Sequence, residues 1–180
     1  LLVVNRLIIR CNLRLLEPTE LERATNVLSP KLYDPRFLSI YSNLAQGIAE
    51  ASCPAVGLNQ LRPLFASMLA NPLNADGEPL ALSHIHYLIG YVDVKTGAHA
   101  EASQQFRASL AAQPDAGSAM SMAALMATEG NLEEALELSE KALEFLDVVT
   151  RGVRLGIKVT ENDIRVFRAA VRAEMDARTD

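Results

Sequence analysis

The sequence has few cysteines and histidines and lacks a long apolar stretch, which argues against disulfide frameworks, metal sites and membrane spans. Its 180 residues include no tryptophan, two cysteines and three histidines. The two cysteines, Cys11 and Cys53, are too few for a disulfide framework, and both one bridge and no bridge remain open. No stretch approaches the roughly 18 apolar residues that a membrane span requires.

Motifs that mark common active sites are also missing. The sequence has no G-x-x-x-x-G-K-[ST] phosphate loop, no G-x-G-x-x-G fingerprint and no G-x-S-x-G nucleophile turn. His84 and His86 are close in sequence, but residues two apart on a helix point to different sides. No cysteine or carboxylate joins them at the spacing of metal ligands. We therefore predict a non-catalytic protein without a metal site or a cofactor.

The charge balance argues against nucleic acid as the ligand. Acidic residues outnumber basic ones by 22 to 17, for a net charge of −5, whereas phosphate binding requires clustered Lys and Arg. The basic residues gather near the two ends of the chain, which leaves a basic patch facing a membrane surface as an alternative. Those near the ends include Arg6, Arg10, Arg14, Arg151, Arg154, Lys158, Arg165, Arg168 and Arg172.

A repeat occupies the middle of the sequence. Gly97 is followed by Ala102 and Ser109, and Gly130 is followed at the same offsets by Ala135 and Ala142. The two glycines lie 33 positions apart, each between two helical patterns, where a tight turn favours glycine. Such a period is typical of stacked helical hairpins.

This repeat resembles the tetratricopeptide (TPR) family. In residues 83–116 the family pattern is matched by His86, Ile89-Gly90, Gly97, Ala102, Phe106, Ser109-Leu110 and Pro114, with His in place of the usual Trp. In residues 116–149 it is matched by Met122-Ala123, Gly130, Ala135 and Ala142-Leu143. There, Ala119 and Ser139 replace the two large residues, and the closing proline is missing.

The segments before and after the two repeats depart from the pattern. Residues 34–72 are interpreted as a degenerate TPR-like hairpin, and residues 72–82 as a connecting loop. Residues 6–15 and 153–159 alternate apolar and polar side chains, which is typical of strands. For residues 6–15 a helix is an equal alternative, because Arg6, Arg10 and Arg14 lie four apart. Helices are predicted over 21–28 and over 164–175, the second after a capping box at Thr160–Asp163.

The predicted fold is therefore mainly α, a TPR-like stack of antiparallel helical hairpins. A small two-stranded β element formed by the chain ends is an additional option. The predicted organisation is an N-terminal flanking segment (1–33), the degenerate hairpin (34–72), two TPR repeats (83–149), and a strand-like segment with a C-terminal helix (150–180).

The resemblance also implies where a partner binds. In TPR proteins the first helix of each repeat lines a concave groove, and matching positions predict a protein- or peptide-binding site. Its residues are His84, Tyr87, Tyr91, Lys95, Gln46, Glu50, Met120 and Thr128. The alternative is that Tyr87 and Tyr91 pack beneath the preceding unit. The groove lacks the basic clamp of carboxylate-binding TPR domains, which argues against capture of a C-terminal carboxylate.

Two functions follow as hypotheses. The first is a non-catalytic scaffold, cytoplasmic or tethered. The second is an extracytoplasmic accessory domain, because the start of the repeat at Ser83 and the Asn71-Pro72 pair are similar to the TPR-bearing regions of bacterial membrane O-antigen polymerases and pilin oligosaccharyltransferases. The sequence starts at Leu1 rather than Met, which predicts a longer polypeptide. Residues 1–4 are then either the last turn of an upstream membrane helix or the start of a core element. Self-assembly through the end of the stack is a third hypothesis.

Overall fold

The described part of the chain is mainly helical. A computed structural model describes residues 17, 19–20, 23, 61–63, 65–66, 69–70, 79–148 and 159–179. Its helices are α5 (Pro79–Thr96), α6 (His99–Ala112), α7 (Ala116–Thr128), α8 (Leu132–Val148) and α9 (Glu161–Thr179). No strand occurs among these described residues. The predicted strands at 6–15 and 153–159 (apart from Val159), the predicted helix at 21–28 (apart from Arg23) and most of the degenerate hairpin lie outside the described residues.

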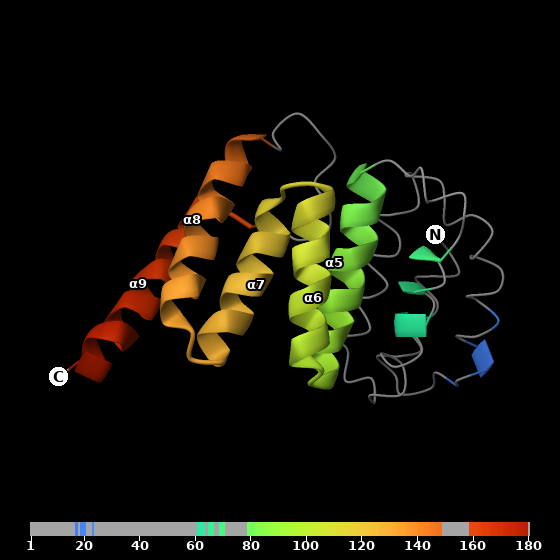
Figure 1. The fold of residues 1–180 in the computed structure, drawn as a ribbon, viewed down its shortest axis with the longest axis horizontal. Coiled ribbons are helices and arrows are strands. Elements are labelled where there is room, and N and C mark those ends of the chain that lie inside the picture. Colours follow the sequence, from blue (N-terminus) through green and yellow to red (C-terminus); the bar gives the residue numbers. More distant parts are fainter. Residues whose placement is uncertain are drawn as a thin grey trace.

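The helices follow one another in antiparallel order. Helix α5 packs chiefly on α6 and α7 chiefly on α8, while α6 contacts α7 and α9 lies against α8 (Figure 1). Helix α5 begins at Pro79, within the segment that the sequence predicted as loop. Proline suits the first position of a helix, because the backbone N–H that it lacks would have no partner there.

The turns after α5 and α7 have the same backbone structure, and both contain the predicted glycine. Gly97 has φ of 82° and Gly130 has φ of 83°. The Ala98 N–H donates to the Asp93 carbonyl over 2.8 Å, and the Asn131 N–H donates to the Met126 carbonyl over 2.9 Å. These bonds satisfy carbonyls at the helix ends, and the positive φ explains why glycine stands at both turns.

Two helix starts are fixed by side-chain caps. Asp115 precedes α7 and accepts hydrogen bonds from the N–H groups of Gly117 and Ser118, over 2.8 and 3.0 Å. Before α9, the Thr160 N–H donates to the Asp163 carboxylate over 2.8 Å, and the Asp163 N–H donates to the Thr160 hydroxyl over 3.2 Å. The predicted capping box is thus confirmed, and α9 extends at both ends beyond the predicted 164–175.

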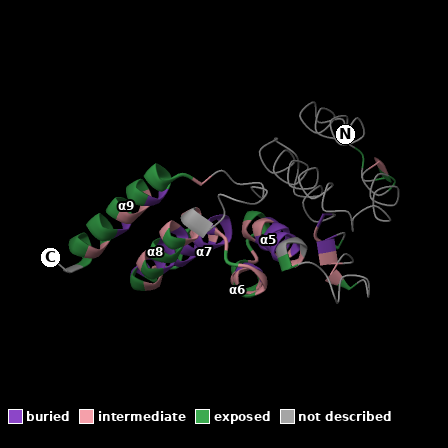
Figure 2. Ribbon diagram, turned by 90° about the horizontal axis from the view of Figure 1, so that it is seen from above, coloured by how far each residue is buried: buried purple, intermediate pink, exposed green. Residues whose placement is uncertain are grey.

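The core runs through the facing sides of the helices (Figure 2). On one side of α5, Ile85, Leu88 and Val92 share a cluster with Leu61 and Phe65 of the preceding segment. A second cluster joins residues of α7 and α8 to α9: Ala116, Ala119, Ala142 and Ile164.

A close contact inside the first hairpin explains one small residue. Gly90 lies on α5 opposite the Phe106 ring of α6, and a Cβ at Gly90 would come within 2.8 Å of the ring. At the same offsets in the second hairpin, Ala123 takes the place of Gly90 and Ser139 the place of Phe106. Because α8 carries the small Ser139 there instead of an aromatic ring, α7 has room for the Ala123 side chain.

Candidate interaction face on α5 and α7

The structure divides the predicted partner-binding stripe of α5 into a buried and an accessible part. His84 and Tyr87 are buried, with 1% and 6% of their surfaces exposed. Tyr91 is half-buried at the edge of the core, and Lys95 is exposed. The accessible part of α5 on this side is therefore its C-terminal half.

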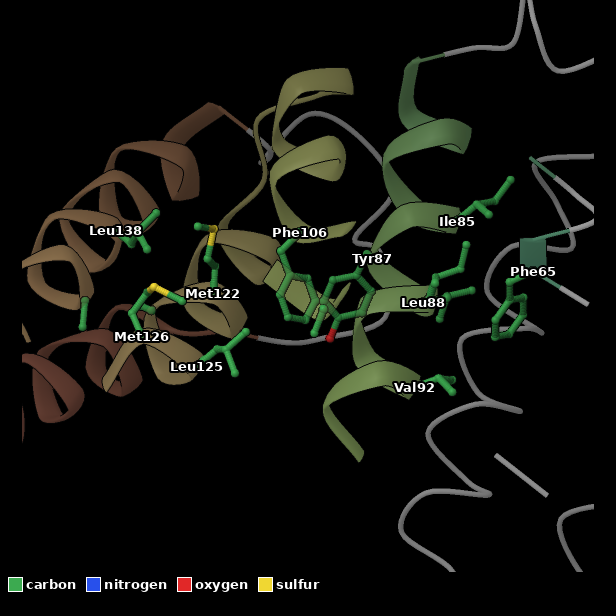
Figure 3. Packing of buried hydrophobic residues seen from close by; sticks show 14 of the residues in the cluster. Phe65, Ile85, Tyr87, Leu88, Val92, Phe106, Met122, Leu125, Met126 and Leu138 are labelled. Atoms are coloured by element: carbon green, nitrogen blue, oxygen red, sulfur yellow. The ribbon is translucent and has the colours of Figure 1, made fainter. Parts of the chain in front are cut away.

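Tyr87 is covered by the helices that follow α5. Its ring lies 5.9 Å from the Phe106 ring and 6.3 Å from the Tyr91 ring, between centroids. Figure 3 shows the side chain among residues of α6 and α7, with its hydroxyl directed towards Leu125. Burial raises the pKa of the Tyr87 phenol well above its ordinary value, while the Ser121 hydroxyl of α7 acts in the opposite direction. Tyr87 thus belongs to the packing between the hairpins, and it packs on the following unit.

Tyr91 and Lys95 form the accessible pair on α5. The Lys95 ammonium lies 5.6 Å from the centre of the Tyr91 ring, within the range of a cation–π contact. Such a pair offers a flat aromatic surface and a positive charge next to each other. An exposed cation–π contact contributes only about 0.5–1 kcal/mol, so Lys95 can turn to a partner at low cost.

Helix α7 contributes smaller side chains. Met120 is half-buried, whereas Ala124 and Thr128 are exposed. The Thr128 hydroxyl donates to the Leu125 carbonyl over 2.7 Å, which leaves its methyl group and the neighbouring alanine surface for contact. Two further predicted residues, Gln46 and Glu50, lie outside the described residues. We use the name α5–α7 face for the accessible set, which consists of Tyr91, Lys95, Ala124 and Thr128.

The two closely spaced histidines have different neighbours. His86 is half-buried, and its Nδ1 lies 2.8 Å from the Gln105 Oε1 of α6. His84 is buried beside Tyr87, with 6.4 Å between the ring centres. Among the described residues, no group of three or more His, Cys, Asp or Glu side chains is arranged to hold a metal ion.

An ion pair with a buried carboxylate, which sequence reasoning missed, joins α5 to the segment before it. Asp93 has a fully buried side chain, and Arg62 is 42% exposed. The Arg62 Nε and Nη2 donate to the two carboxylate oxygens of Asp93 over 2.5 and 3.3 Å. The hydrogen bond to Asp93 raises the pKa of the Arg62 guanidinium. In the sequence, the feature that could have indicated this ion pair is the single acidic residue within the apolar run 87–94.

The candidate site is a surface on α5 and α7 that combines apolar and positively charged side chains. Its described side chains offer aromatic, methyl and ammonium groups. No helix among the described residues is long and apolar enough to cross a membrane. Comparison of the chain with protein-family models, curated proteins and solved structures finds no match.

Proposed function

We propose that this chain is a non-catalytic, TPR-like stack of helical hairpins that binds a protein partner on the α5–α7 face. The proposal is supported by the repetition of one structural unit. Two hairpins carry matching glycine turns with matching hydrogen bonds, at the spacing that the sequence repeat predicts. Their first helices, α5 and α7, contact each other and place the accessible residues on neighbouring elements.

The chemistry of the face favours a protein or peptide over a small molecule. Tyrosine is over-represented among the residues that contribute most to the affinity of protein interfaces. Tyr91 is anchored at the edge of the core, so little conformational freedom is lost when a partner covers its exposed part. Lys95 adds a charge that attracts an acidic or carbonyl-rich segment.

The test is the affinity of a partner for two surface variants. The partner is first identified by affinity capture with the wild-type chain and then purified for calorimetry. We expect Tyr91→Ala/Lys95→Ala to weaken binding at least about tenfold, which corresponds to about 1.4 kcal/mol. The matched control is Glu137→Ala/Glu144→Ala, two exposed positions on α8. Equal affinities for both variants would exclude the α5–α7 face.

A further inference from the structure

Three buried serines meet where the two hairpins join. Ser83 lies in α5, Ser109 near the end of α6 and Ser118 in the first turn of α7. The start of α5, the end of α6 and the start of α7 lie at the same end of the helical array (Figure 1). Each of the three residues is at most 1% exposed.

The hydroxyl groups form a chain centred on Ser109. Its Oγ lies 2.7 Å from the Ser83 carbonyl oxygen, 3.0 Å from the Ser83 Oγ and 2.8 Å from the Ser118 Oγ. A carbonyl only accepts, so the single Ser109 proton points to the Ser83 carbonyl. Ser109 therefore accepts from Ser118, and the Ser83 hydroxyl donates either to Ser109 or, over 3.4 Å, to the Gln113 carbonyl. In this assignment Ser118 is the donor of the hydrogen bond that crosses between the hairpins.

The second hairpin has no matching pair of hydroxyl groups. At the offset of 33 residues, Ser83 and Ser109 correspond to Ala116 and Ala142, which have no hydroxyl. A second polar link between the hairpins, from Arg107 to Glu134 over 3.3 Å, joins two side chains that are 62% and 42% exposed. An exposed pair of this kind holds its partners loosely. The Ser118–Ser109 bond is fully buried and directional.

We propose that the Ser118–Ser109 hydrogen bond fixes the orientation of the second hairpin relative to the first. Apolar contacts stabilise the joint but are non-directional, so they tolerate small shifts of one helix along another. A buried hydrogen bond penalises such shifts, because displacement leaves polar groups unsatisfied in the interior. The hydrogen bond would thereby also set the relative position of α5 and α7. The inference is independent of the proposed function and would hold if the α5–α7 face bound no partner.

Two single variants separate orientation from general stability. Ser118→Ala removes the hydroxyl that crosses between the hairpins, and Ser109 still donates to the Ser83 carbonyl. Ser83→Ala is the matched control, since it removes a hydroxyl that lies 3.0 Å from the same Ser109 Oγ but belongs to the first hairpin. Both remove one hydrogen bond, so we expect each to lower Tm by only about 2–4 °C.

The measurement is a distance distribution between spin labels in the full chain, after replacement of Cys11 and Cys53 by serine. Labels at Gln104→Cys on α6 and Glu137→Cys on α8 report on the two hairpins, and both positions are exposed. Labels at Ala124→Cys and Glu137→Cys report on the second hairpin alone.

We expect Ser118→Ala to shift or broaden the distribution between the hairpins and to leave the distribution within the second hairpin unchanged. Ser83→Ala should leave both as in the wild type. Wild-type distributions in Ser118→Ala would overturn the proposal, as would equal broadening in both variants. Loss of cooperative folding in Ser118→Ala would also overturn it, because the hydroxyl would then stabilise the fold as a whole.

Discussion

The contact between Gly90 and Phe106 leads to a prediction whose sign depends on a second residue. A Cβ at Gly90 would lie 2.8 Å from Cε1 and 2.9 Å from Cδ1 of Phe106. Carbon atoms normally approach no closer than about 3.5 Å. The ring cannot easily retreat, because Phe106 is 1% exposed and packs against Tyr87. We therefore expect Gly90→Ala to strain the first hairpin.

The magnitude follows from two opposing effects. Replacing glycine by alanine inside a helix stabilises it by about 1 kcal/mol. Overpacking a well-filled core costs about 1–3 kcal/mol. The wild-type chain should therefore lose up to about 2 kcal/mol on Gly90→Ala. With Phe106→Leu in place the clash is relieved, and the same substitution should stabilise the chain by up to about 1 kcal/mol. The second hairpin, with Ala123 and Ser139, already contains this combination of small residues.

The assay is urea denaturation of the four chains of a double-mutant cycle, followed by circular dichroism. A coupling free energy of about 1–3 kcal/mol between the two positions is expected. Gly90→Ala that stabilises the wild-type chain, or that has the same effect in both backgrounds, would refute the packing argument.

Two further predictions concern charged groups. Arg62→Ala should destabilise the chain by about 2–4 kcal/mol in urea denaturation, because the buried Asp93 carboxylate loses its partner. If this is the cause, the double variant Arg62→Ala/Asp93→Asn should lose less stability than Arg62→Ala alone. Equal losses in the two variants would contradict it. Asp163 has a pKa lowered from 3.8, chiefly by the hydrogen bond from the Thr160 hydroxyl. Its depressed folded-state pKa contributes stability above pH 3.8, and that stability is lost as the pH falls through the lowered value. Asp163→Asn should reduce the loss of Tm on acidification below pH 4, and an unchanged pH profile would count against the capping box as its source.

Local sequence signals predicted the secondary structure of the middle and end of the chain. The glycines at 97 and 130 marked both turns because each turn requires a positive φ, a property of one residue and its neighbours. The cap before α9 could also be predicted from neighbouring residues, since Thr160 and Asp163 lie three residues apart. The start of α5 was misplaced because the Asn, Asp and Gly of the preceding segment suggested a longer loop, and Pro79 is compatible with both.

The candidate site was less predictable because burial depends on neighbouring elements. A helical stripe identified Tyr87 and Tyr91 as one surface, but the crossing of α6 and α7 covers Tyr87 and leaves Tyr91 at the edge. The Arg62–Asp93 pair joins residues 31 positions apart, in segments whose relative position no local pattern specifies.

The most direct test of the α5–α7 face is site-specific photo-crosslinking to the purified partner. A photoreactive phenylalanine analogue is placed at the exposed Ala124 on α7, and, as the control, at the exposed Glu144 on α8. The proposed function predicts a crosslinked product from position 124 that disappears in Tyr91→Ala/Lys95→Ala, and none from position 144. Crosslinking from position 144 alone would contradict it and would place the partner on α8.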